Sequence, residues 1–129
     1  MLGHLSFGVR DLARAGRFYD PVMAALGQAR VFDGPAAIGY GAPGTANDRL
    51  LLVLREDAAP PGPGFHLAFD APNRGAVDAF HVAALANGGT DNGAPGVRER
   101  YSPTYYAAFV IDPDGYRLEA VCQAPRPVS

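Results

Sequence analysis

The sequence predicts an α+β protein built from two copies of a β-α-β-β-β unit. Each half of the 129-residue chain opens with a strand-like run that carries a histidine, His4 in the first half and His66 in the second, 62 residues apart. A helix-like segment follows each run, and Phe18 and Phe80 occupy the same place in these two segments at the same spacing. Shared order at a fixed period is typical of an internal duplication.

The first unit follows from its periodicity. Residues 2–9 alternate between an apolar face and a small polar face that includes His4, which is typical of a strand. Asp11 is suited to cap a helix that ends near Leu26, although Pro21 lacks a backbone donor and favours a kink or break there. The remaining elements expected in this unit are strands at residues 28–32 and 36–40, a loop at 41–48 and a strand at 49–55.

A proline-rich segment divides the chain. It includes Pro60, Pro61 and Pro63, and such composition is typical of a linker. We therefore expect one domain over residues 1–129, made of a first module at 2–56, a linker at 57–64 and a second module at 65–123.

The second unit repeats the pattern of the first. Residues 65–70 alternate like a strand, and a helix is expected from Pro72-Asn73 to Asn87. Residues 92–101 are interpreted as a loop with a short strand near 97–100. The unit ends in a hairpin of strands 105–111 and 116–122, whose turn Asp112-Pro113-Asp114-Gly115 has the residues that favour a tight reversal.

Glu119 stands out because it lies in the middle of an apolar strand. Alternation places it on the same face as Arg117 and Val121, away from the apolar face. A glutamate in this position needs a partner. The sequence leaves two interpretations open: an ordinary pairing with Arg117, Arg100 or solvent, or a role as metal ligand or general base.

Composition excludes several classes of function. The formal net charge of −2 and the lack of a basic cluster argue against binding to nucleic acid or to a membrane surface. The single cysteine, Cys122, excludes an intrachain disulfide and is expected to be buried in its strand. Without a signal-like segment or an apolar span, we expect a soluble, cytoplasmic protein.

The duplicated unit resembles the vicinal oxygen chelate superfamily of glyoxalases, bleomycin resistance proteins and type I extradiol dioxygenases. The resemblance is carried by the histidine on the first strand of each half, by Asp-Pro-Asp-Gly before the last strand and by Leu-Glu-Ala-Val within it. It covers residues 2–123. It implies that the two modules form a curled mixed sheet, a cup that holds a divalent metal.

The resemblance also implies a ligand set. The family takes its ligands from the first and last strands of each module, which here gives His4, His66 and Glu119. The fourth position departs from the pattern because the counterpart of Glu119 in the first module is Leu51 in the preferred alignment. Glu56 is an alternative that requires a slipped register.

Two histidines and a carboxylate on one face would leave open positions on Fe²⁺, Mn²⁺, Zn²⁺ or Ni²⁺. The implied chemistry is lyase or isomerase chemistry of the glyoxalase type, or ring-cleaving oxygenation, with Glu119 moving a proton. Tyr101, Tyr105 and Tyr106 are candidate phenolic donors, and Tyr106 is taken with Glu119 as the catalytic pair. The third histidine, His81, is expected to face solvent on its helix.

A function of another class stays open. Relatives of the bleomycin-resistance type keep the cup and sequester a small molecule without a metal. For either function the expected partner is a small-molecule substrate or ligand. The resemblance also implies a homodimer, in which the modules of two chains could be exchanged.

Overall fold

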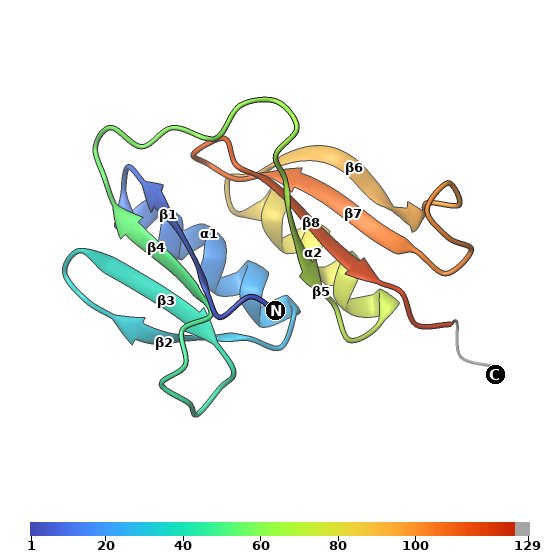
Figure 1. Ribbon diagram of the computed structural model, residues 1–129, viewed down its shortest axis with the longest axis horizontal. Coiled ribbons are helices and arrows are strands. Elements are labelled where there is room, and N and C mark those ends of the chain that lie inside the picture. The colour runs from blue at the N-terminus through green and yellow to red at the C-terminus, as the bar shows by residue number, and fades with distance from the viewer. Residues whose placement is uncertain (126–129) are drawn as a thin grey trace.

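The computed structural model describes residues 1–125, and it consists of two halves that each carry one helix on one face of a four-stranded sheet (Figure 1). The first half contains β1 (Leu5–Val9), α1 (Leu12–Ala25), β2 (Ala29–Asp33), β3 (Ala37–Gly41) and β4 (Leu50–Leu54). The second half contains β5 (Leu67–Asp70), α2 (Arg74–Ala86), β6 (Thr90–Val97), β7 (Tyr106–Ile111) and β8 (Arg117–Cys122). This element order confirms the predicted fold class.

The two sheets have the same mixed topology. Their strand orders are β1-β4-β3-β2 and β5-β8-β7-β6, and in each the first and last strands of the unit pair in parallel while the other pairs are antiparallel. Leu51 lies opposite Ser6 in the first sheet, and Glu119 lies opposite Ala68 in the second. The register therefore agrees with the alignment of Leu51, rather than Glu56, to Glu119.

Both helices begin at the residues that the sequence indicates. The side chain of Asp11 accepts a hydrogen bond from the Arg14 backbone N–H at 3.0 Å, and that of Asn73 accepts one from Ala76 at 2.8 Å. The expected break at Pro21 is wrong, because α1 continues through it as one helix. The buried face of α1, which includes Phe18 and Val22, stabilises the helix against the loss of one backbone hydrogen bond.

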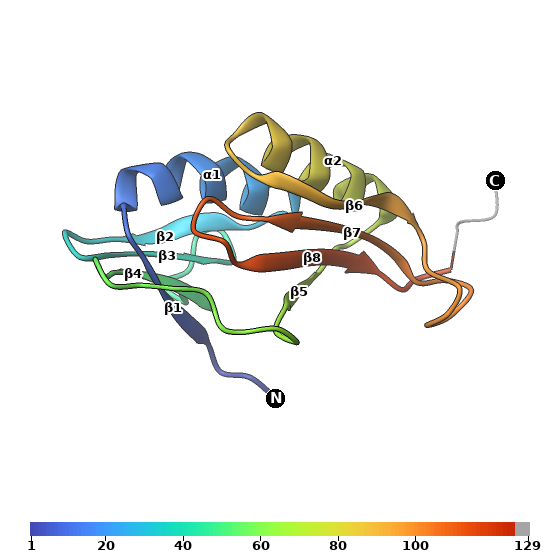
Figure 2. The ribbon, with the colours of Figure 1, turned by 90° about the horizontal axis from the view of Figure 1, so that it is seen from above.

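The hydrophobic core lies between the helices and the sheets. α1 and α2 lie on the same side of the two sheets and pack against each other (Figure 2). Each helix contributes one fully buried phenylalanine, Phe18 and Phe80, to a core that is continuous between the halves. Within residues 1–125 the opposite face of each sheet carries no helix, so side chains that point away from the helices form an open face.

The structure corrects the interpretation of residues 92–101. β6 spans Thr90–Val97, where we expected a loop and a short strand beyond it. Its pairing with β7 shifts register between Asp91 and Gly93 and again between Gly93 and Gly96. Glycines and Pro95 hide the strand from pattern analysis, and the edge of a sheet tolerates such irregularity.

The turn between β7 and β8 has the predicted geometry. Gly115 has a positive φ of 96°, which favours glycine. The Asp112 carboxylate accepts hydrogen bonds from the backbone N–H groups of Asp114 and Tyr116 at 2.9 and 2.8 Å. These bonds fix the register of β8 and so determine which face Glu119 occupies.

The same turn holds the two halves together. Asp114 accepts hydrogen bonds from the Arg10 backbone N–H at 3.1 Å and from the Arg14 guanidinium at 2.8 Å. The Tyr116 hydroxyl donates to the Gly8 carbonyl at 2.7 Å, and its ring centroid lies 4.2 Å from that of Phe7. The last hairpin is thus docked onto β1 and the start of α1.

No helix in the described part of the chain is long and apolar enough to cross a lipid bilayer.

Candidate functional site

Glu119 is a buried carboxylate on the open face of the second sheet. It is only 1% exposed, and it lies on β8, an inner strand flanked by β5 and β7. Its cross-strand neighbours are Ala68 on β5 and Phe109 on β7. Burying an ionised carboxylate is costly unless other groups hydrogen-bond to it, so its partners define the site.

His66 is the first partner of Glu119. It directly precedes β5, two residues before Ala68, and its Nε2 lies 2.8 Å from Oε1 of Glu119. The imidazole is 51% exposed, while the carboxylate below it is covered. Both residues were predicted to lie at the site, and they are in contact in the structure.

Tyr105 is the second partner. Its hydroxyl donates to Oε2 of Glu119 at 2.5 Å, so both oxygens of the carboxylate are engaged. Burial, together with the adjacent Glu119 carboxylate, raises the pKa of Tyr105 to about 12. The phenol therefore stays protonated near neutral pH and can act as a hydrogen-bond donor.

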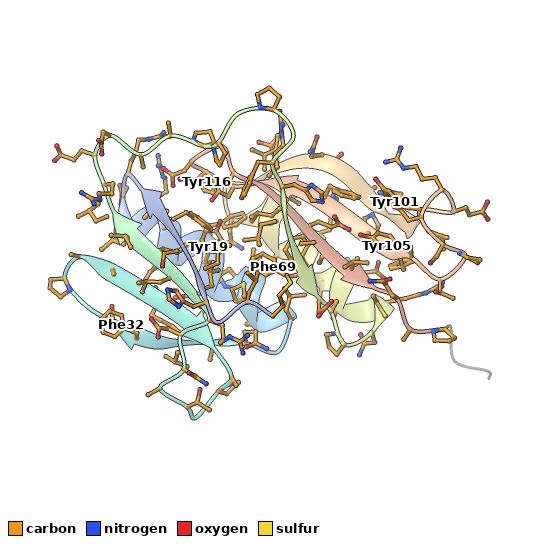
Figure 3. All side chains as sticks on the ribbon, in the orientation of Figure 1. Tyr19, Phe32, Phe69, Tyr101, Tyr105 and Tyr116 are labelled. Atoms are coloured by element: carbon orange, nitrogen blue, oxygen red, sulfur yellow. The ribbon has the colours of Figure 1, made fainter. Side chains whose placement is uncertain are left out.

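Aromatic rings surround this polar cluster on the open face. The Phe109 ring centroid lies 6.3 Å from that of His66, and the Tyr101 centroid lies 4.9 Å from that of Tyr105. Tyr101 and Tyr105 project side by side at the end of the second sheet (Figure 3). An exposed imidazole above a buried carboxylate, bordered by rings, suits a flat molecule with polar substituents.

The structure places Tyr106 away from this cluster. Its hydroxyl donates to Asp78 on α2 at 2.6 Å, and its ring lies under the Arg74 guanidinium on the helix side of the sheet. Side chains of successive strand residues point to opposite faces, so only one of the two adjacent tyrosines can reach Glu119. Tyr105 therefore makes the contact with Glu119 that was predicted for Tyr106.

His4 does not join His66 and Glu119. It is exposed just before β1, in a groove of about 400 Å³ between the two sheets that Arg49 and Asp70 also line. Among residues 1–125, no three or more His, Cys, Asp or Glu side chains gather in a way that could hold a metal ion. Within one chain the expected three-ligand cluster is therefore not assembled.

The first sheet lacks an equivalent of the site. Leu51 occupies the position of Glu119, opposite Ser6 and Gly39. The loop before β4 also folds over this face, because a Cβ added at Gly39 would lie 2.7 Å from the Cβ of Asp48. The two halves share a fold, but only the second carries the buried carboxylate.

The expectation that His81 faces solvent is wrong. Its side chain is only 12% exposed, and its Nε2 lies 2.9 Å from a carboxylate oxygen of Asp91 on β6. The hydrogen bond to His81 also lowers the pKa of Asp91. β6 covers the helix face on which His81 lies, and this strand was not predicted.

The family of this chain follows from its match to a protein-family model. The model of the Glyoxalase/Bleomycin resistance protein/Dioxygenase superfamily matches residues 1–120. The chain belongs to this superfamily. A search of curated protein sequences gives no match.

Solved structures of the glyoxalase superfamily share the fold. A glyoxalase/bleomycin resistance protein from Albidiferax ferrireducens T118 is 31% identical, with a TM-score of 0.79 over 92% of this chain and 95% of that one. A family enzyme from Burkholderia phytofirmans PsJN is 22% identical, with a TM-score of 0.69 over 93% and 96%. A V278E mutant of glyoxalase I from Zea mays is 22% identical, with a TM-score of 0.67 over 93% of this chain and 45% of that one.

Because the resemblance to this superfamily implies a divalent metal, His66 and Glu119 need to be compared with the ligands that such an ion requires. His66 Nε2 and Glu119 Oε1, 2.8 Å apart, are close enough to share an ion and are donor types that metals accept. Catalytic ions usually have three protein ligands, and the described residues of one chain bring no third donor to this pair. One chain therefore provides an incomplete site, and an ion here would need a donor from elsewhere.

Proposed function

We propose that this glyoxalase-superfamily protein binds a small molecule with two adjacent oxygen atoms on the open face of its second sheet and transfers a proton there. The observation that carries the proposal is the buried Glu119 carboxylate, with His66 and Tyr105 on its two oxygens. A carboxylate fixed in this way is suited to act as a general base. The His66 imidazole, which is 51% exposed above the carboxylate, is a part of the cluster that a substrate can reach.

Before any ion is bound, the three residues have separate roles in this proposal. Once a substrate displaces the His66 imidazole from Oε1, Glu119 accepts a proton from a substrate hydroxyl or from a carbon next to a carbonyl. Tyr105 holds the carboxylate in place and donates a hydrogen bond, which its raised pKa allows at neutral pH. His66, which is half exposed, contacts the substrate oxygen and orients it toward Glu119. Tyr106 has no part in these steps.

The divalent metal belongs to the same proposal. His66 and Glu119 would supply two ligands, and His4 of a second copy is our candidate for the third, since His4 is exposed beside the edge strand β1. A homodimer with shared cups would thus complete the donor set. An ion such as Fe²⁺, Mn²⁺, Zn²⁺ or Ni²⁺ would polarise adjacent substrate oxygens, as needed for lyase, isomerase or oxygenase chemistry.

The alternative function is sequestration of a small molecule without a metal. One observation favours it: His66 and Tyr105 already satisfy both oxygens of Glu119 inside a single chain. In that case the aromatic rings and the polar cluster serve recognition alone.

Metal content distinguishes the two functions. We would purify the untagged protein and measure iron, manganese, zinc and nickel per chain for the wild type, His4→Ala, His66→Ala and Glu119→Ala. The metal-dependent proposal expects near-stoichiometric metal that each substitution abolishes, and the matched control Tyr106→Phe keeps it. Metal-free wild type after supplementation with each ion, with small-molecule binding retained, would establish sequestration instead.

A further inference from the structure

Arg98 is fixed over the open face of the second sheet by three contacts. Its two terminal nitrogens donate to the backbone carbonyls of Gly96 and Ala94, at 3.0 and 2.7 Å. Its guanidinium carbon lies 5.4 Å from the centroid of the Phe109 ring. These contacts hold a long, normally flexible side chain in one orientation, which reduces the entropy lost when it binds a ligand.

The irregular strand β6 provides the surface on which Arg98 lies. A Cβ added at Gly93 would come within 3.3 Å of one terminal nitrogen of Arg98, and a Cβ added at Gly96 within 3.1 Å of the other. Both distances are shorter than ordinary van der Waals contacts. The bare backbone at these two glycines is therefore what allows the guanidinium to lie flat against the strand.

Arg98 has no anionic partner within the part of the chain that the structure describes. Every ion pair within 4.0 Å there involves other residues. Two of its five N–H donors bond to the two carbonyls, and no hydrogen bond among the described residues uses the other three. An oriented but unpaired guanidinium is a receptor for a planar oxyanion.

Phe109 connects this cation to the Glu119 cluster. Its ring centroid lies 5.4 Å from the Arg98 guanidinium carbon and 6.3 Å from the His66 ring centroid, and Phe109 lies directly opposite Glu119. All four side chains therefore share the open face. A ligand bound at His66 and Glu119 that extends over Phe109 would reach Arg98.

We propose that Arg98 determines specificity for a planar monocarboxylate, such as an aromatic acid whose ring lies against Phe109. This inference rests on the proposed function, because it assigns the substrate class of the same site. One fixed guanidinium balances one negative charge, while the nearby Glu119 carboxylate disfavours a dianion such as a phosphate monoester. The carboxylate would bind Arg98, and a neighbouring hydroxyl or carbonyl oxygen would face His66 and Glu119.

The test compares salicylate with its neutral amide, salicylamide. Both are planar and carry the same hydroxyl, so the difference in their affinity measures recognition of the carboxylate. We would obtain the dissociation constants from ¹H–¹⁵N chemical-shift titrations of the full chain, following the amides of β6 and β7. Phenyl phosphate serves as a third probe, for the dianion.

We expect salicylate to bind the wild type about tenfold or more tightly than salicylamide, as for a charge-assisted hydrogen bond. Arg98→Gln should bring this ratio close to one, and Arg98→Lys should restore part of it. Arg100→Gln is the matched control, since the Arg100 guanidinium also stacks on a ring, 4.9 Å from the Tyr101 centroid, and it should leave the ratio unchanged.

The remaining outcomes separate this inference from the proposed function. A ratio near one in the wild type, or one that survives Arg98→Gln, overturns the role of Arg98 but leaves small-molecule binding intact. Tighter binding of phenyl phosphate than of salicylate overturns the choice of a monocarboxylate. If none of the three probes shifts the amides around Glu119, both the inference and the proposed function fail.

Discussion

At the scale of single residues, Glu119 serves the proposed function at a cost to the free energy of unfolding. A carboxylate that is 1% exposed carries a cost of desolvation that an apolar residue would avoid. The chain contains its own comparison, because Leu51 occupies the equivalent position in the first sheet. The fold therefore accepts leucine at the equivalent position, where the desolvation cost of Glu119 has no counterpart.

From this we expect Glu119→Leu to leave the free energy of unfolding unchanged or to raise it by about 1–2 kcal/mol. His66 and Tyr105 can turn toward water once the carboxylate is gone. Denaturant unfolding of both proteins measures the change, and Glu99→Leu, at an exposed position, is the control. A loss of more than about 2 kcal/mol would mean that Glu119 is a structural anchor.

Tyr105 should show its contact with Glu119 in its titration. Its pKa, raised to about 12, lies above that of an unfolded tyrosine near 10. The folded state therefore binds the proton more tightly, and the stability from this group is complete below pH 10 and is lost as the pH rises through 12. Ultraviolet titration should reveal a phenolate near pH 12 that Tyr105→Phe removes.

The same titration of the Glu119→Gln variant tests whether Glu119 is the cause of the raised Tyr105 pKa. Without the negative charge of the carboxylate, the Tyr105 phenol should ionise at a lower pH than in the wild type. A Tyr105 midpoint near 10 in the wild type would show that the hydrogen bond to Glu119 does not form in solution.

At the scale of elements, the sequence predicted those whose pattern is regular. Alternation and helix caps located β1, α1, β5 and α2 to within a few residues. β6 was missed because glycine and proline are turn signals, while here the bare backbone accommodates the Arg98 guanidinium. A glycine can be required at a position because a side chain from elsewhere packs on its backbone. The local sequence pattern does not contain this information.

Among the three candidate tyrosines, Tyr105 could have been chosen over Tyr106 from the sequence, and the hairpin register is the signal. Asp112 pairs with Tyr116 across the turn, and counting outward from this pair puts Phe109 opposite Glu119. Alternation then places Tyr105 on the same face. The separation of His4 from His66 and Glu119, in contrast, depends on how the two halves pack, which no local pattern contains.

β6 should be sensitive to added side chains at its irregular positions. Gly93 has a φ of 149°, and a Cβ there would lie 3.1 Å from a ring carbon of Phe109. We expect Gly93→Ala to lower the free energy of unfolding by about 1–3 kcal/mol, through backbone strain and displacement of that ring. Gly62→Ala, where nothing lies within 4 Å, should change it by less than about 0.5 kcal/mol.

Unfolding in urea, followed by circular dichroism, measures both variants of this pair. Equal stability of Gly93→Ala and the wild type would show that the bulge relaxes freely. The Arg98 guanidinium would then not be fixed by the strand.

At the scale of the whole molecule, the last hairpin links the two halves. Asp114, whose side chain is 2% exposed, accepts hydrogen bonds from the Arg10 backbone and the Arg14 guanidinium in the other half. Asp112, in the same turn, accepts a hydrogen bond from the buried Tyr19 hydroxyl on α1 at 2.5 Å. Because the turn that fixes Glu119 also contacts the first half, the geometry of the site depends on the docking of the two halves.

We therefore expect the two halves to unfold together. Asp114→Ala should then lower the free energy of unfolding of both halves. The substitution removes a buried acceptor and leaves the Arg10 N–H without its partner, which should cost about 2–3 kcal/mol, allowing for the 36% exposure of Arg14. Asp33→Ala is the matched control, since it breaks an exposed pair with Arg30 and should cost less than about 1 kcal/mol.

Native-state hydrogen exchange measures the stability of the two halves separately, through the protection of backbone amides in β3 and in β7. Equal loss of protection on both strands in Asp114→Ala supports coupling, whereas loss on β7 alone would mean that the second half opens independently and that the first half does not hold Glu119 in place.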